Sequence, residues 1–511
     1  MSVVVGDAIK KKSCEIVADR ISNLPLELTH RILECLTLQE AAKTSVLAQH
    51  WRFIWASIPQ LILDEWIIKE KWKKFNNNML AVGFARKCIK TTTDRISNLP
   101  PNVTKQILEC LPLQEAARMS ILSSHWRQKW ALISQLILDE GFFSNILKHR
   151  TETADISLAY SKAVNDILFS HVGPISKLVL YLPSWFPKEI DLCQWIRYVR
   201  ANGVQDFTLV YDRDPEKNLP ASLFSCVGLT HLTLCKLISL PPNFRGFPCL
   251  VSLSTSIATC VHSPSTSIDA NVLETLISKC PQLQSLYLLI IDPQVNLSIR
   301  APNLEDLYVE GLLSELCLKG DTVITKLTLD VDFDKPSLQN RHMSEIFTCL
   351  TNVEKLVLRE RFWWRIRSYD SPKKFPSKLE QLRTLKLEGM TLHRQWTISL
   401  ALSFFVSCPH LEQLYIKASK LHAVSDQPPS DKIEGSCILP CLKNVQLFGI
   451  SGLTGELQLI KFLLAYSPLL EEMAIELSTT IGGAAEKFDF AKETVRYHRA
   501  STNVEVIINA K

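Results

Sequence analysis

From about residue 171 onward, apolar residues recur in a short phrase of the form L-x-x-L-x-L. Successive phrases start 20 to 33 residues apart, most often 29. Apolar residues that alternate with polar ones predict a short strand with one buried face. The clearest phrases are Leu283-Leu286-Leu288, Leu304-Leu307-Val309, Val353-Leu356-Leu358, Leu382-Leu385-Leu387 and Leu411-Leu414-Ile416, and looser ones start at Ile175, Val204, Leu229, Leu250, Ile324, Leu442 and Leu470.

Between the phrases, apolar residues often have helical spacing, as in Leu273-Leu276-Ile277 and Leu402-Phe405-Val406. A strand and a helix at this period are typical of a leucine-rich repeat. One such unit cannot bury its own leucines, so the units must stack. We therefore expect an α/β leucine-rich-repeat solenoid over residues 171–436, with a curved parallel sheet and outer helices. Binding should then depend on the polar positions between the leucines and on longer inserts.

One such insert, Arg359–Ser377, is both basic and aromatic. Its tryptophans are adjacent, and adjacent residues of a strand face opposite ways, so burial of both in one core is not readily explained. Arginine and tryptophan are also favoured as interface anchors. The candidate target-binding residues are Arg361, Trp363, Trp364 and Arg365. A locally packed loop is the alternative interpretation of the same residues.

The first third of the chain contains a segment written twice, at residues 19–65 and 94–140. The copies align without a gap at an offset of 75, and 32 of 47 positions are identical. Most positions that are apolar in one copy are apolar in the other, whereas several charged positions differ between the copies, and this pattern predicts a small packed helical unit. In each copy a Leu-Pro pair opens a first helix with an apolar stripe at four-residue spacing. Two tryptophans, such as Trp126 and Trp130, lie one turn apart on a third helix.

A unit of this size buries little of its own surface, so its apolar stripe predicts docking against another protein. The paired tryptophans fit either that docking or the core of the unit itself. The segments DRISNLP, ILECL and LQEAA, together with the HWR…W ending, resemble the F-box of plant F-box proteins. We therefore expect two small all-α F-box units to precede the solenoid.

The resemblance implies that this unit binds a Skp-type adaptor, which links it to a cullin. By position, the implied adaptor-binding residues are Leu24, Pro25, Leu28, Ile32 and Leu36 in the first copy, and Leu99, Pro100, Val103, Ile107 and Leu111 in the second. We expect the second copy to be the working one, because it runs directly into the first leucine phrase. The first copy is attached through a polar, basic linker.

Residues 437–511 resemble the FBD domain that follows leucine-rich repeats in many plant F-box proteins. The matching pieces are CLKNVQLFGISGLTGELQLIKFLLAYSPLLEEMAI and YHRASTNVEVII. This segment is expected to serve as the C-terminal cap of the solenoid. The remaining segments are an N-terminal leader at 1–18, a basic linker at 66–93 and a connector at 141–170.

Composition and local sequence features limit the class of protein, its location and its ligands. Hydrophobic residues make up 46% and charged residues 21% of the 511 residues, which is typical of a globular protein. The sequence has no apolar run of membrane-spanning length and no signal-peptide core, so a cytoplasmic or nuclear location is expected. The 15 cysteines are scattered singly, as in a protein from a reducing compartment, and their spacing predicts no metal site. The linker, with basic and aromatic residues interleaved, favours a solvated amphipathic connector over a nucleic-acid site.

The sequence carries no phosphate-binding glycine loop, nucleophile elbow or zinc-protease motif, and we expect neither enzyme activity nor a cofactor. The favoured function is that of the substrate-recognition subunit of an SCF-type ubiquitin ligase. In it, the F-box binds the adaptor and the repeats bind an unknown target protein. The alternative is a leucine-rich scaffold or decoy that binds a partner without recruiting a ligase.

Overall fold

The computed structural model divides the chain into two compact units. One comprises residues 1–191 and 201–204, and the other comprises residues 192–200 and 205–511. Both copies' Leu-Pro corners lie outside the described residues, as does the whole of the first copy. The described residues are 101–109, 111, 113–118, 129–147, 153–183, 192–211, 219–235, 239–257, 270–290, 296–313, 315–319, 322–333, 350–366, 379–392, 395–419, 438–479 and 483–509.

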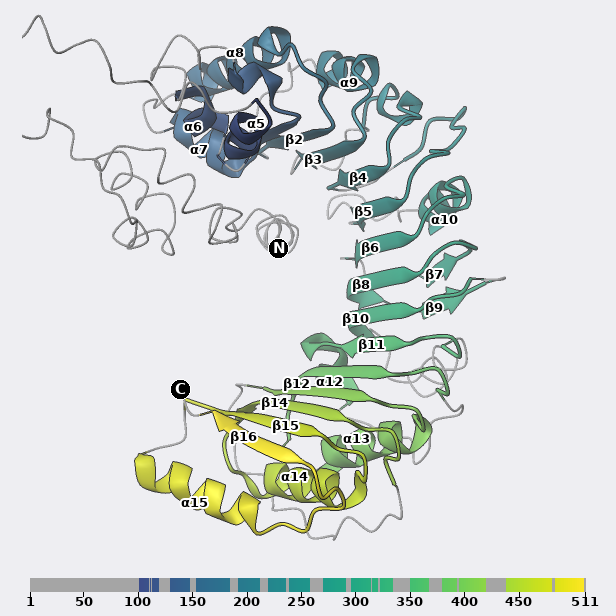
Figure 1. The fold of residues 1–511 in the computed structure, drawn as a ribbon. Helices are drawn as coiled ribbons and strands as arrows, with labels where there is room; N and C mark the ends of the chain where they lie inside the picture. The colour runs from purple at the N-terminus through teal and green to yellow at the C-terminus, as the bar shows by residue number, and fades with distance from the viewer. Residues whose placement is uncertain are drawn as a thin grey trace, which may run out of the picture. The chain divides into compact units, whose positions relative to one another are not determined.

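The first unit contains the second copy of the repeated segment and its continuation (Figure 1). Its two strands pair in parallel and bury alternate leucines against α7 and α8, where Phe143 and Tyr160 pack edge to face. Its elements are α5 (Pro101–Glu109), α6 (Leu113–Arg118), the 3₁₀ helix η4 (Lys129–Leu132), β1 (Gln135–Leu138), α7 (Glu140–Leu147), α8 (Thr153–Ser170) and β2 (Lys177–Leu182).

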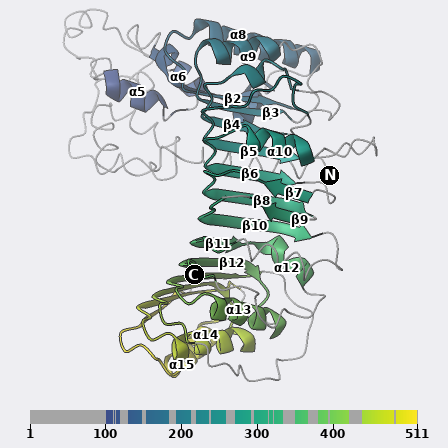
Figure 2. The ribbon, with the colours of Figure 1, turned by 90° about the vertical axis from the view of Figure 1, so that its right-hand side faces the viewer.

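The second unit contains a parallel sheet that the leucine phrases build (Figure 2). Register aligns the phrases, so that Leu327 lies beside Leu356 and Leu356 beside Leu385, and all three are fully buried. In sheet order, its strands are β3 (Asp206–Tyr211), β4 (His231–Leu234), β5 (Ser252–Ile257), β6 (Ser285–Ile290), β8 (Asp306–Leu313), β10 (Lys326–Phe333), β11 (Lys355–Leu358), β12 (Thr384–Met390), β13 (Gln413–Ala418), β14 (Asn444–Ile450), β15 (Glu472–Leu477) and β16 (Glu505–Asn509). The expected leucine-rich-repeat sheet is confirmed.

Helices connect the longer repeats, as the apolar spacing predicts. They are α9 (Leu192–Ala201), α10 (Ala270–Ser278), α12 (Glu360–Ile366), α13 (Gln395–Ser407) and α14 (Thr454–Tyr466). The two repeats that start at Leu283 and Leu304 are among the shortest, with 21 and 20 residues before the next phrase. Their connections contain β7 (Asn296–Ile299) and β9 (Glu315–Leu318), which pair in parallel as a separate small sheet. An extended segment returns the chain with fewer residues than a helix needs.

The FBD-like segment continues the same sheet. Strands β14, β15 and β16 pair in parallel, and α14 and α15 (Ala484–Val495) follow β14 and β15. Glu456 organises the start of α14, where its Oε2 accepts hydrogen bonds from the backbone N–H groups of Ser451 and Leu453. The last helix buries Phe490 but leaves Phe488 exposed. No helix in the described part of the chain is long and apolar enough to cross a membrane.

Candidate functional site

The second copy of the repeated segment presents part of its predicted apolar stripe. Ile107 on α5 and Leu111 just beyond it are partly exposed, whereas Leu108 is buried. Val103 lies in α5, but its side chain is outside the described residues, as are Leu99 and Pro100. The five candidate positions of the first copy, Leu24, Pro25, Leu28, Ile32 and Leu36, are also outside them.

The end of the second copy is fixed by hydrogen bonds to His171, Val172 and Gly173, which directly follow the connector. The N–H groups of Val172 and Gly173 both donate to the carbonyl oxygen of Ala131. The Nε2 of His171 donates to the carbonyl of Ile133 at 2.8 Å. A side chain at Gly173 would place its Cβ 3.2 Å from the Cα of Leu132, so the glycine allows this close approach. We call His171, Val172 and Gly173 the clamp segment.

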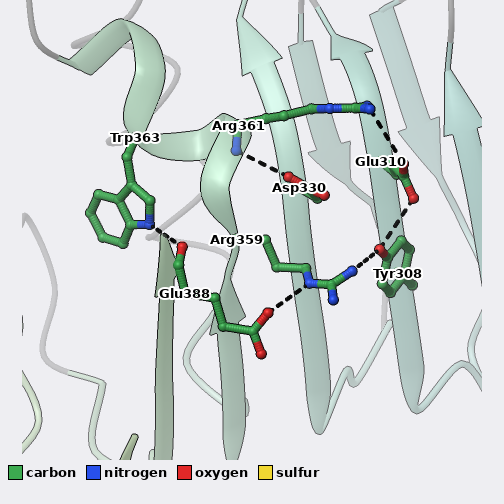
Figure 3. A network of polar contacts seen from close by, with 7 residues as sticks. All are labelled: Tyr308, Glu310, Asp330, Arg359, Arg361, Trp363 and Glu388. Carbon is green, nitrogen blue, oxygen red and sulfur yellow. Dashed lines mark hydrogen bonds and ion pairs between the residues drawn. The ribbon is translucent and has the colours of Figure 1, made fainter. Parts of the chain in front are cut away.

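The repeat sheet presents a second set of side chains between its leucine columns. Residues that alternate with buried leucines point to the opposite face of a sheet. On β6, β8 and β10 these residues include Tyr287, Tyr308, Glu310 and Asp330. The short helix α12 lies near the carboxyl ends of these strands (Figure 3). It contributes Arg361 and Trp363, and Arg359 directly precedes it.

Glu310 is the centre of the first half of this network. Its carboxylate is 8% exposed and accepts hydrogen bonds from the hydroxyl groups of Tyr287 at 2.8 Å and Tyr308 at 3.2 Å. The two tyrosine rings stack with centroids 4.4 Å apart. Arg361 Nη2 lies 3.6 Å from the other carboxylate oxygen. A buried charge with three partners is well compensated, so Glu310 is held in one position.

Arg359 connects the two halves of the network (Figure 3). Its Nη1 donates to the Tyr308 hydroxyl at 2.8 Å, and its Nε donates to Glu388 Oε2 at 2.9 Å. Asp330 Oδ1 accepts the backbone N–H of Arg361 at 3.1 Å, near the start of α12. Strands β8, β10 and β12 are thereby tied to α12 through charged hydrogen bonds.

Burial is the main cause of the pKa shifts of Asp330, Tyr287 and Tyr308 in this cluster. It raises the pKa of the Asp330 carboxyl, although the Arg361 N–H and guanidinium partly oppose the shift. Burial and the neighbouring Glu310 charge raise the pKa values of Tyr287 and Tyr308, which therefore remain neutral donors. For Arg359, burial by itself lowers the pKa, but the hydrogen bond and charge of Glu388 raise it overall.

Of the four candidate target-binding residues, Trp363 requires a correction. Its side chain is only 1% exposed, and its indole N–H donates to the carbonyl oxygen of Glu388 at 2.9 Å. It therefore belongs to the core, because a helix, rather than a strand, carries the two tryptophans and lets one of them turn inward. Arg361 is partly exposed but is engaged with Glu310. The side chains of Trp364 and Arg365 are outside the described residues.

The approach of α12 to the sheet depends on a glycine. Gly389 follows Glu388 at an irregularity in β12 and has a φ of +79°. A Cβ at this position would lie 2.8 Å from the Cα of Glu360. Sequence reasoning did not identify this glycine or the tyrosines and carboxylates of the network. The sequence does place these residues between the apolar positions of a leucine phrase, as in Leu307-Tyr308-Val309-Glu310-Gly311, and that alternation indicates the polar face of a strand.

The chemistry of this face is that of recognition by charged and aromatic side chains. Within the described ranges, no group of three or more histidine, cysteine or acidic residues could hold a metal ion. Lys386 lies over the ring of Tyr415 at 5.0 Å, and Tyr415 packs against Phe448 at 4.7 Å between centroids. These three residues extend the polar and aromatic surface from β12 to β14.

Comparison with known proteins gives matches over most of the chain. The F-box domain model matches residues 21–62 and 96–134, so its second match ends directly before β1. The model for the LRR repeats of FBD-associated F-box protein At5g56370 matches residues 192–329.

Relatives that match most of the chain include proteins from Arabidopsis thaliana. The F-box/FBD/LRR-repeat protein At1g13570 is 30% identical over 426 residues, covering 81% of this chain and 98% of the relative. The F-box/FBD/LRR-repeat protein At1g51370 is 26% identical, covering 81% of this chain and 96% of the relative. A putative F-box protein, At3g58860, is also 26% identical, with 76% and 89% covered.

Proposed function

Because the chain belongs to the plant F-box/FBD/LRR-repeat family, we propose that it is the substrate-recognition subunit of an SCF-type cullin–RING ubiquitin ligase. The observation that carries this proposal is the combination of two F-box matches with a long leucine-rich-repeat sheet in one chain. F-box domains generally bind Skp-type adaptors, and proteins with this domain combination are generally non-catalytic. Ubiquitin transfer would therefore be catalysed by other subunits.

The adaptor would bind the Leu-Pro corner and the first-helix stripe of an F-box. In the second copy, the partial exposure of Ile107 and Leu111 supports this assignment, because apolar side chains there remain available for burial against a partner. Leu99, Pro100 and Val103 complete the proposed surface, and the corresponding residues of the first copy are Leu24, Pro25, Leu28, Ile32 and Leu36.

We assign the working role to the second copy. The clamp segment, which directly follows the connector, forms hydrogen bonds with the end of this copy, and β1 directly follows the η4 helix of the copy. A ligase receptor must hold its target at a defined distance from the catalytic subunit, and a loose tether lowers the effective concentration of productive arrangements. The hydrogen bonds at Ala131 and Ile133 provide such a fixed connection within the first unit.

The test uses the whole chain with alanine pairs in one copy or in both. The quadruple variant Leu24→Ala, Pro25→Ala, Leu99→Ala and Pro100→Ala should lose co-purification of the adaptor, since each buried leucine contributes about 2–5 kcal/mol. In a reconstituted ubiquitination assay, the Leu99/Pro100 pair should reduce target modification more than the Leu24/Pro25 pair. Full adaptor binding by the quadruple variant would refute the ligase role. Equal loss from the two pairs would refute the assignment to the second copy.

Point variants suit this test better than a deletion of residues 1–140. That deletion would remove β1, whose leucines are fully buried beside β2. A scaffold or decoy is the alternative function. It predicts target binding by the whole chain without adaptor binding by either copy, which the same purification distinguishes.

A further inference from the structure

The carboxylates of the central sheet face are already used within the protein. Glu310 is held by Tyr287, Tyr308 and Arg361, as described above. Asp330 accepts a backbone hydrogen bond from α12, and Glu388 pairs with Arg359. The same contacts engage Arg359 and Arg361. Neither these arginines nor the three carboxylates can therefore bind a new partner without breaking the attachment of α12.

Four lysines on the same face differ from these carboxylates and arginines, because they form no ion pair among the described residues. Lys326, Lys355, Lys386 and Lys417 lie on the consecutive strands β10, β11, β12 and β13. Each alternates with buried leucines, so each points to the polar face. Across the described residues, no carboxylate oxygen comes within 4.0 Å of any of these four ammonium groups. Among the described residues, these four lysines therefore form no ion pair.

The positions of these lysines follow the strand register. Lys326 lies beside Lys355, Lys386 is two residues further along its strand, and Lys417 is two residues further again. With strands about 4.8 Å apart and about 3.3 Å per residue, each diagonal step from Lys355 to Lys417 is about 8 Å. Alternate side chains of an extended peptide are about 7 Å apart on one side. A strand-like segment with an acidic residue at every second position therefore matches the diagonal.

An aromatic pair terminates the lysine diagonal. Lys417 lies beside Phe448 in the register, and Phe448 packs against Tyr415 with both rings partly exposed. An apolar side chain next to the acidic run would bury these rings. Glu388 lies beside Lys417 within the strip, where Arg359 pairs with its carboxylate. Further acidic residues lie on both sides of the strip, with Asp306 on β8 and Glu472 and Glu476 on β15, and they would repel an acidic segment that extended further.

We propose that the face formed by Lys355, Lys386, Lys417, Tyr415 and Phe448 binds an extended acidic segment of the target protein that carries one apolar anchor. This inference rests on the proposed function, because it names the chemistry of the target that the repeats would hold. The carboxylates of the segment pair with the three lysines, and the anchor packs on the Tyr415–Phe448 pair. Lys326 extends the strip by one strand.

The test measures fluorescence anisotropy with the full-length protein and a labelled synthetic peptide. The peptide has glutamate at every second position and one phenylalanine near its end; a glutamine version and a single-stranded oligonucleotide serve as further probes. The test variant is Lys355→Glu, Lys386→Glu and Lys417→Glu. The matched control, Lys319→Glu, Lys461→Glu and Lys492→Glu, makes the same charge change at exposed positions outside this face. Circular dichroism checks that both variants are folded.

The acidic peptide is expected to bind at least about tenfold more tightly than the glutamine peptide, which corresponds to about 1.4 kcal/mol. The test variant should lose this preference, and the control should keep it. Equal binding of the two peptides, or an equal effect of the two variants, would overturn the proposal. Tighter binding of the oligonucleotide would overturn it in favour of phosphate recognition. Adaptor co-purification, measured on the same protein, separately reports on the ligase role.

Discussion

Trp363 provides the sharpest test of how α12 is attached to the repeat sheet. The Trp363→Ala change removes a side chain that is 1% exposed and a hydrogen bond to the Glu388 carbonyl. Truncation of a buried tryptophan costs about 3–5 kcal/mol, and an unpaired buried carbonyl adds about 1–3 kcal/mol. Trp363→Phe keeps most of the apolar contact but loses the N–H donor, so it should cost about 1–3 kcal/mol.

The assay must resolve local stability, because a repeat protein does not unfold as a single two-state domain. We expect urea unfolding of Trp363→Ala to show an earlier transition. Hydrogen exchange should locate the weakened region at β11, β12 and α12, with β3 and β4 unaffected. Phe488→Ala is the matched control, because that aromatic side chain is 67% exposed and its loss should change the unfolding free energy by less than about 0.5 kcal/mol.

If Trp363→Ala were as stable as the wild type yet lost target binding, the reasoning would be refuted. That outcome would make Trp363 a surface anchor, as the sequence interpretation allowed. Destabilisation confined to neighbouring strands, together with a smaller effect of Trp363→Phe, is the result expected from burial.

Three further predictions follow from single positions. Gly311→Ala should lower the unfolding free energy by about 3 kcal/mol or more, measured by chemical denaturation, because the added Cβ would lie 1.8 Å from the Ile290 carbonyl oxygen at a φ of +115°. Burial raises the pKa of Asp330 in the folded state, so the wild-type protein becomes less stable as the pH rises through that pKa and the buried carboxyl ionises. Asp330→Asn should therefore be more stable than the wild type at pH 7, and thermal unfolding should show this difference shrinking below about pH 4. His171→Ala leaves the Ile133 carbonyl without its side-chain donor, and hydrogen exchange around η4 and β1 should become faster, whereas Ser176→Ala should have little effect.

The sequence was a good guide to the repeat sheet because leucine burial is a local, periodic signal. Leu356, Leu385 and Leu414 occupy equivalent places in their phrases, and the structure aligns them in one column. Spacing also limits the connections: repeats of 28 or more residues have room for helices such as α13 and α14, whereas two of the three repeats of 20 or 21 residues contain the short strands β7 and β9. The sequence pattern predicts helices between many of the phrases, and it does not predict these two short strands.

Pairings between distant residues were beyond the reach of the sequence. Nothing near Arg359 in the sequence indicates that its partners are Tyr308 and Glu388, which lie 51 and 29 residues away. The exposure predicted for the adjacent tryptophans was wrong at Trp363 for a related reason, because the direction of each side chain depends on whether a strand or a helix carries the pair. The end of the second copy shows the same limit, because the sequence pattern predicts an all-α unit over residues 94–140, whereas Gln135–Leu138 forms β1 and pairs with β2.

The two kinds of cation on the sheet face suit different tasks. Arg359 holds Tyr308 and Glu388 at once, which its planar guanidinium with several fixed donors allows. A lysine ammonium is strongly hydrated, sits on a flexible stem and can reorient its donors toward an arriving carboxylate. The arginines at α12 are therefore suited to a permanent internal attachment. Lys355, Lys386 and Lys417 are suited to contacts that form when a target binds and break when it dissociates. If that division is correct, reversing the lysines should change target affinity and its salt dependence while leaving the attachment of α12 intact.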